Sequence, residues 1–151
     1  MGDRQRLKLL IKEIDRQGGT KNYSVSRPLV SLELFFQGND VTGSICANIT
    51  DQEMESVGGL PGVYRLLTRI KQRVGVQDVL VPIYDYEEDE GWPNADSIIV
   101  ICSQSQDAVE GWVEAIRPSE TTDITAEWDK YRTDAAPDLD KGMRAYLLWW
   151  D

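Results

Sequence analysis

Hydrophobic residues follow a strand pattern on both sides of an acidic stretch in the middle of the chain. Residues 78–84 form a short apolar run rich in β-branched residues, which favours a strand. Pro82 lacks a backbone N–H, so this strand should lie at an edge, carry a bulge or pair on one side only. Residues 96–103 contain five consecutive apolar residues, which is typical of a central strand covered on both faces. Residues 85–95 are predicted to connect the two as a solvated hairpin loop.

Three segments have apolar residues at helical spacing: 4–16, 61–74 and the segment between Ser103 and Pro118. The first also fits a strand over residues 7–11, so both interpretations stay open there. In the last, Trp112 belongs to the apolar stripe and is predicted to be a core residue. The solvent face of the second is wholly basic. We expect that face to meet the acidic loop or tail of the same chain, with a phosphate site as the alternative.

Polarity alternates along residues 29–37, which predicts a half-buried strand. Turn residues follow at 38–40, and residues 44–49 are predicted as the partner strand of a hairpin. Asn39, Asp40 and Asn48 are an alternative polar site at its tip, although turn formation explains the first two. Cys46 and Cys102 both fall inside predicted strands, where buried, reduced thiols are usual.

The last third of the chain combines a polar connection with an aromatic end. Residues 119–141 are long, polar and acidic, and Trp128 and Tyr131 are spaced to share one face of a short helical turn. Residues 144–151 are predicted to dock as a final strand, because their aromatic residues would be a solubility hazard if exposed. The patterns together predict a single α+β domain over residues 1–151. Its four- to five-stranded, mainly antiparallel sheet has two or three helices packed chiefly on one face.

Charge limits the choice of partners. The chain has 151 residues and a formal net charge of −10, which disfavours nucleic acid and anionic membranes and favours a basic protein. No apolar run approaches the ~20 residues that span a bilayer. The first residues do not resemble a signal peptide, so we expect a cytoplasmic protein.

Candidate chemistry is sparse. The chain contains no histidine, the commonest general base and zinc ligand. Glu87, Glu88, Asp89 and Glu90 are contiguous, whereas calcium loops place carboxylates at alternating positions around a glycine. Phosphate-binding glycine patterns are missing around Gly58 and Gly59. We therefore expect no enzyme activity, no metal and no cofactor, with carboxylate-pair or lysine chemistry formally open.

Several motifs carry a resemblance: residues 35–40 (Phe-Phe-Gln-Gly-Asn-Asp), the hairpin predicted after them, Trp92-Pro93 before a strand, and the terminal Trp-Asp. With these the chain resembles small uncharacterised bacterial proteins, from which no activity transfers. In size, acidity and α+β pattern it is also similar in kind to immunity proteins of bacterial toxin systems, such as the SUKH family. No residue roles transfer from that likeness.

These features predict a non-catalytic interaction protein, of the immunity-inhibitor kind, that binds a basic protein partner. Aromatic residues would supply affinity and acidic residues the association rate. The candidate partner-binding residues are Glu87, Glu88, Asp89, Glu90, Trp128, Tyr131, Trp149 and Trp150. Two alternatives remain: a homo-oligomer in which the apolar tail pairs across a symmetric interface, and a small-molecule binder or enzyme.

Overall fold

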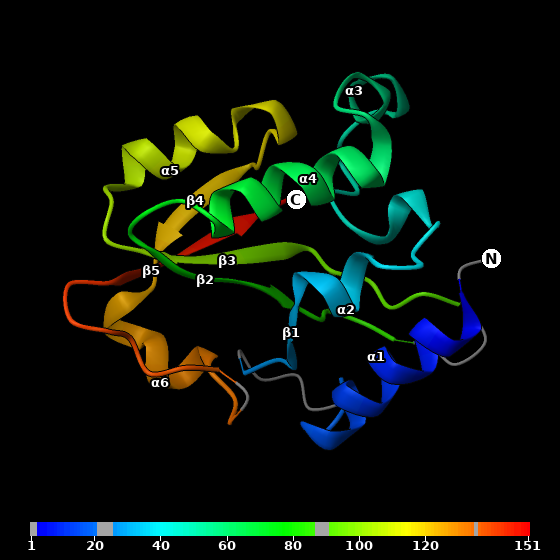
Figure 1. The fold of residues 1–151 in the computed structure, drawn as a ribbon, viewed down its shortest axis with the longest axis horizontal. Coiled ribbons are helices and arrows are strands. Elements are labelled where there is room, and N and C mark those ends of the chain that lie inside the picture. The colour runs from blue at the N-terminus through cyan, green and yellow to red at the C-terminus, as the bar shows by residue number, and fades with distance from the viewer. Residues whose placement is uncertain (1–2, 21–25, 87–90, 135) are drawn as a thin grey trace.

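A five-stranded antiparallel sheet organises the chain (Figure 1), as the sequence predicts. The computed structural model describes residues 3–20, 26–86, 91–134 and 136–151. The strand order is β1-β2-β3-β5-β4. The strands are β1 (Leu29–Ser31), β2 (Val76–Pro82), β3 (Ser97–Cys102), β4 (Glu120–Asp123) and β5 (Arg144–Trp149).

β3 is the central strand, and every one of its residues is buried. Ile98 and Val100 belong to the larger core cluster, whereas Ile99 and Ile101 belong to a second cluster on the other face. The apolar run is unbroken because successive side chains point to opposite faces of the sheet and both faces are covered, as predicted.

The predicted C-terminal strand is β5, which lies inside the sheet. It pairs with β3 on one side and with β4 on the other. Both of its edges are hydrogen-bonded, so it has no free edge for a second copy of the chain. A homo-oligomer would therefore have to use a surface other than an edge of β5.

β2 is an interior strand with a register shift between Val76 and Asp78. Its pairing with β3 ends at Leu80, whereas Pro82 still pairs with Leu29 of β1. Of the arrangements that proline permits, the chain uses pairing on one side only at this position.

Six α-helices occur within the described residues, more than the two or three predicted. They are α1 (Arg4–Arg16), α2 (Leu32–Phe36), α3 (Asp51–Ser56), α4 (Gly59–Lys71), α5 (Gln106–Trp112) and α6 (Trp128–Tyr131). Three short 3₁₀ helices, η1 (Thr42–Ser44), η2 (Glu114–Ile116) and η3 (Thr125–Glu127), complete the described elements. None of the helices in these ranges is long and apolar enough to cross a membrane.

The two faces of the sheet are covered unequally. Buried residues of α1, α2, α4 and α5 share the larger core, which includes Leu10, Phe35, Leu67 and Val109. The other face carries the smaller cluster around Trp128, to which Tyr131 and residues 136–143 add half-buried side chains. In Figure 1, α6 accordingly lies across the sheet from α4 and α5.

The predicted hairpin of residues 29–37 and 44–49 is wrong. Only β1 is extended, and α2 starts directly after it because Ser31 Oγ accepts a hydrogen bond from the Leu34 N–H at 3.1 Å, a helix N-cap. Residues 42–44 form η1, and Cys46 has a positive φ of 55°, which interrupts any strand there. Both cysteines are nevertheless free and buried.

Candidate functional site

The five tryptophans divide into two kinds. Trp92, Trp128 and Trp150 are buried, and each donates its indole N–H to a backbone carbonyl, of Phe35 at 2.9 Å, Pro137 at 3.1 Å and Ile116 at 2.7 Å. Trp112 and Trp149 are half-buried, and among the described residues neither indole N–H has a hydrogen-bond acceptor. Buried tryptophans normally satisfy this donor, so the two exceptions mark surfaces where a ligand would find both an apolar ring and a free N–H.

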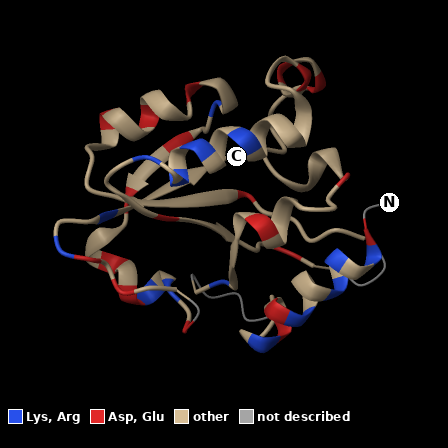
Figure 2. Ribbon diagram, viewed as in Figure 1, with Lys and Arg blue, Asp and Glu red and all other residues tan. Residues whose placement is uncertain are grey.

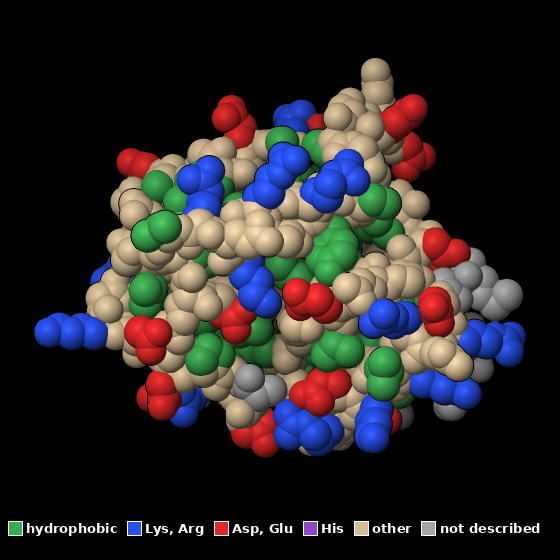
Figure 3. Space-filling model, in the orientation of Figure 1, with side chains coloured by type: hydrophobic (Ala, Val, Ile, Leu, Met, Phe, Trp, Pro, Cys, Tyr) green, Lys and Arg blue, Asp and Glu red, His purple; other side chains and the backbone are tan. Residues whose placement is uncertain are grey.

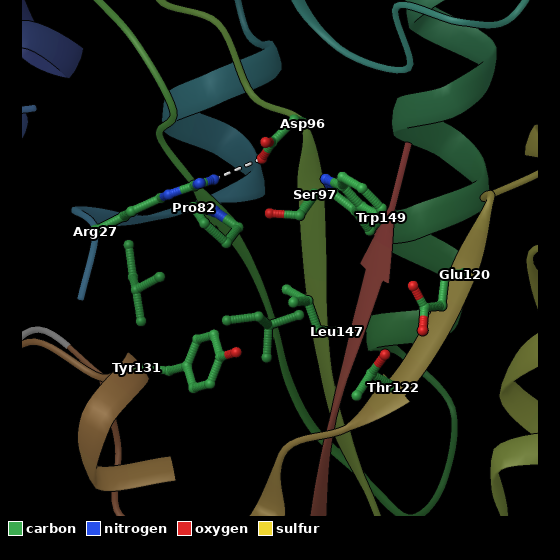
Figure 4. A pocket seen from close by; sticks show the side chains of 11 residues that line it. Arg27, Pro82, Asp96, Ser97, Glu120, Thr122, Tyr131, Leu147 and Trp149 are labelled. Atoms are coloured by element: carbon green, nitrogen blue, oxygen red, sulfur yellow. Dashed lines mark hydrogen bonds and ion pairs between the residues drawn. The ribbon is translucent and has the colours of Figure 1, made fainter. Parts of the chain in front are cut away.

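Trp149 lies in a pocket of about 190 Å³ on the second face of the sheet, which we call the sheet hollow (Figure 4). It is the part of that face that α6 and residues 136–143 leave uncovered. Its lining residues are Arg27, Leu29, Pro82, Asp96, Ser97, Ile99, Glu120, Thr122, Tyr131, Leu147 and Trp149.

Strand register builds the floor of the sheet hollow. Ile99 and Leu147 are paired across β3 and β5, so their side chains stand next to each other on the same face. Trp149 is flanked in the same way by Ser97 of β3 and Glu120 of β4. The small Ser97 leaves room for the indole, which Figure 4 places beside it.

Tyr131 forms the opposite wall, and its hydroxyl points into the hollow (Figure 4). It follows Trp128 by one helical turn in α6, and the buried Trp128 ring holds this short helix against the sheet. Trp128 and Tyr131 thus lie on one face of α6, as predicted. Trp128 is buried against the sheet, and Tyr131 forms part of the surface of the hollow.

The rim carries charge of both signs. Arg27 donates to Asp96 Oδ1 at 2.6 Å, and its guanidinium lies over the Tyr84 ring at 5.1 Å. The negative charge of Asp96 is therefore balanced by Arg27. Glu120 is exposed and has no hydrogen bond or ion pair with another described residue, and its carboxylate points toward the hollow (Figure 4).

The end of β4 is fixed by a third carboxylate. Asp123 accepts hydrogen bonds from the Thr125 hydroxyl at 2.5 Å and the Thr125 N–H at 2.9 Å, and from Arg144 Nε at 2.6 Å. Partial burial raises the pKa of Asp123, but these hydrogen bonds outweigh it and hold that pKa below its usual value. They anchor the chain between β4 and α6, which are two walls of the hollow.

The structure separates the predicted partner-binding residues. Tyr131 and Trp149 meet in the sheet hollow, although 18 positions separate them in the sequence. Trp128 and Trp150 are buried with their N–H groups used, so neither offers an exposed contact. Glu87, Glu88, Asp89 and Glu90 lie outside the described residues.

Sequence reasoning missed Arg27, Asp96 and Glu120. Arg27 and Asp96 lie just before β1 and β3, Glu120 is the first residue of β4, and only the strand order brings them together. No local pattern marks such residues. Glu120 has one weak strand indication in the sequence: it directly precedes two β-branched residues, Thr121 and Thr122, which strands favour.

The volume of the sheet hollow and the groups around it limit what it could hold. Its volume is below the roughly 300–1,000 Å³ of ordinary small-molecule sites, so it suits one side chain of a larger partner. Among the described residues, no group of three or more Cys, Asp or Glu is arranged to hold a metal ion. Burial raises the pKa of the Cys46 and Cys102 thiols, which disfavours the reactive thiolate.

Residues 5–148 match a family described as "Uncharacterized protein YfbO family". The chain is also similar to "Uncharacterized protein YfbO" of Escherichia coli (strain K12), with 32% identity over 146 residues. That alignment covers 96% of this chain and 98% of the Escherichia coli protein. No solved structure matches the chain. The extent of the two sequence matches shows that the chain belongs to the YfbO family.

Proposed function

We propose that the chain is a non-catalytic interaction protein whose sheet hollow receives a lysine or arginine side chain of a basic protein partner. One observation carries this proposal: the Trp149 indole, the Tyr131 hydroxyl and the Glu120 carboxylate, which has no ion-pair partner among the described residues, line the same small hollow. An aromatic ring attracts a cation to its face, and tryptophan does so most strongly. A carboxylate beside the ring would complete the pairing.

The charge of this face supports a basic partner. Residues 119–140, which cover much of the second face, contain seven acidic and two basic residues. Arg132, Arg144 and Arg16 meet part of that charge through ion pairs. Glu120, Glu127 and Asp140 are exposed without an ion-pair partner among the described residues. Such a surface speeds encounter with a positive partner, and salt screens it.

An inhibitor that neutralises a basic bacterial toxin is the specific form of this role that we favour. The small size, the acidity and a single anchor hollow support it, since toxin inhibitors act by occupying a surface and need no chemistry of their own. In that form the partner's lysine or arginine would be the residue on which inhibition depends.

Affinity capture tests the proposal. The tagged protein is used to capture partners from its own host at low and at high salt, with Trp149→Ser and Glu120→Lys as test variants. Trp112→Ser and Glu55→Lys are matched controls, because they make the same changes at a half-buried tryptophan and an exposed glutamate elsewhere. We expect one basic protein that is lost at high salt and with both test variants, and retained with both controls.

Two outcomes would count against the proposal. A partner retained by both Trp149→Ser and Glu120→Lys would bind elsewhere on the molecule. A partner that is acidic, or whose recovery is unaffected by salt, would remove the electrostatic argument. Once a partner is known, replacement of its lysines and arginines one at a time should identify a single anchor whose loss weakens binding by about 2 kcal/mol or more.

A further inference from the structure

A second hollow lies on the helical side of the molecule and is lined by arginines. It occupies about 440 Å³ between α4, the end of α3 and α5, and we call it the arginine hollow. Arg65, Arg69 and Arg73 line it together with Trp112, and Leu66 and Ile70 add apolar surface. Lys and Arg side chains form a row over α4 in the space-filling view (Figure 3), and α4 carries no Asp or Glu (Figure 2).

The three arginines have no carboxylate partner. None of them forms an ion pair with another described residue, whereas the neighbouring Lys71 lies 3.8 Å from both Glu33 and Asp78. The expected match with the acidic tail is absent among the described residues, because the side chains of Trp128, Tyr131 and Leu139 from that tail pack on the other face of the sheet. The acidic residues 87–90 lie outside the described part of the chain. Three adjacent guanidinium groups without an ion-pair partner among the described residues, in a chain with net charge −10, favour the binding of an external anion.

The Arg73 guanidinium has an aromatic contact, and the Arg65 guanidinium lies close to a glycine. The Arg73 guanidinium lies over the Trp112 ring, 4.7 Å from its centroid, which orients the side chain by a cation–π contact. Arg65 lies against Gly58, which has a φ of 93°, and a Cβ there would come within 3.1 Å of Arg65 Nη2. Glycine at this junction of α3 and α4 therefore permits both the left-handed backbone and the position of the guanidinium.

The spacing suits a ligand with more than one anionic group. Arg65 and Arg69 are one turn apart, about 6 Å along the helix axis, and Arg73 follows beyond the end of α4. Guanidinium groups bind carboxylate and phosphate oxygens in pairs of parallel hydrogen bonds. The volume of the arginine hollow is about 440 Å³, against about 190 Å³ for the sheet hollow, which leaves room for a ligand with several anionic groups.

We infer that the arginine hollow binds a small organic polyanion. Its phosphate or carboxylate groups would pair with Arg65, Arg69 and Arg73, and its apolar or planar part would lie on Leu66, Ile70 and the exposed side of Trp112. The site is independent of the proposed partner-binding face, because Trp112 and Trp149 stand on opposite sides of the sheet. Nucleic acid is disfavoured as the occupant, because the rest of the acidic surface repels its phosphates.

The indole N–H signals of the five tryptophans provide the test. In the ¹⁵N-labelled full chain, Trp112 and Trp149 report on the two hollows, and Trp→Phe variants assign the signals. The probes are ATP without metal, inorganic triphosphate and citrate, which separate a planar group from phosphate and from carboxylate. We expect at least one probe to shift the Trp112 signal with a dissociation constant of about 1 mM or tighter, and to leave Trp149 unchanged.

Variants distinguish a specific binding site from nonspecific attraction of anions to positive charge. The double variant Arg65→Gln/Arg69→Gln should weaken binding about tenfold or more, because it removes two charge-assisted contacts. The matched control Arg4→Gln/Arg6→Gln removes the same charge from exposed positions on α1 and should bind normally. The inference is overturned if no probe shifts Trp112, if both double variants weaken binding equally, or if Trp149 shifts as much as Trp112. It is also overturned if an acidic peptide shifts Trp112 and the three small anions do not.

Discussion

The sheet hollow and the arginine hollow are built around the same kind of residue, a half-buried tryptophan without an acceptor for its N–H, yet their surroundings are opposite. Around Trp149 the charged groups are mostly acidic, and the walls are fixed by paired charges, Arg27 with Asp96 and Arg144 with Asp123. Around Trp112 the charged groups are arginines, and they are unpaired within the described structure. Most of the charged side chains around the first hollow form ion pairs within the chain, whereas the arginines around the second hollow do not.

The charged groups of the two hollows therefore differ in what they contribute to folding: the ion pairs beside the sheet hollow stabilise the fold, whereas the arginines of the second hollow do not. A paired charge or a satisfied indole contributes to folding whether or not a partner is present. Adjacent like charges repel, so an unpaired arginine row contributes nothing comparable and slightly opposes folding. Natural proteins retain such features where function requires them.

The largest expected effect is a difference in the free energy of unfolding between alanine variants of Trp150 and of its sequence neighbour Trp149. Trp150→Ala removes a buried indole and its hydrogen bond to the Ile116 carbonyl, and should lower the free energy of unfolding by about 3–5 kcal/mol. Trp149→Ala removes a half-buried ring with no such bond and should cost only about 1–2 kcal/mol. Urea unfolding of the two variants measures both values.

Trp150→Phe serves as a control, since it keeps a buried ring and loses only the N–H donor together with some volume. It should fall between the wild type and Trp150→Ala. Equal losses of stability for Trp149→Ala and Trp150→Ala would show that Trp149 is a structural residue, and the division of the tryptophans into two kinds would fail.

The sequence predicts the interior of this molecule better than its surface. β3, α4 and β5 were foreseen, because a buried strand or a packed helix face must repeat its apolar residues at a fixed period. The same logic failed over residues 29–37, where Leu32 and Phe36 fit alternation but are also spaced as one face of a helix, and Phe35, which breaks the alternation, fits only the helix. The deciding feature there was the Ser31 cap, a local hydrogen bond that periodicity does not register.

The two hollows could be predicted only in part. Tyr131 and Trp149 were singled out for their chemistry, and the basic face of α4 for its periodicity. Their neighbours Arg27, Asp96 and Glu120 are contributed by strand order, which sequence patterns do not encode. Trp112 packs against the larger core, as expected, but it is only half-buried, and the Arg73 guanidinium lies over its ring.

A smaller effect tests whether paired charge holds the wall of the sheet hollow. Asp123→Asn weakens the hydrogen bonds from Arg144 and Thr125 and should lower the free energy of unfolding by about 1 kcal/mol at pH 7. The pKa of Asp123 is depressed in the folded state, so its contribution is present above the unfolded-state pKa. It is lost as the pH falls through the folded-state value. The difference between variant and wild type should therefore shrink below about pH 4.

Urea unfolding at pH 7 and at acid pH measures this change. Asp129→Asn is the control, because the Asp129 side chain is 94% exposed and its contact with Arg132 is 3.6 Å. It should leave stability almost unchanged at both pH values. A pH-independent loss for Asp123→Asn would mean that packing, and not the ionised carboxylate, fixes this wall.

The smallest expected change in stability tests the arginine hollow most directly, because the substitution should raise the free energy of unfolding, whereas most substitutions lower it. Arg65→Glu replaces a like-charge neighbour of Arg69 with a carboxylate four positions before it, the favourable orientation for a helical ion pair. The free energy of unfolding should rise by about 0.5 kcal/mol, and binding of the anionic probes should be lost. Arg65→Gln, which removes the repulsion without adding the pair, should give a smaller gain. If Arg65→Glu instead destabilises the chain, the arginine row is part of what holds α4 in place, and the contrast between the two hollows disappears.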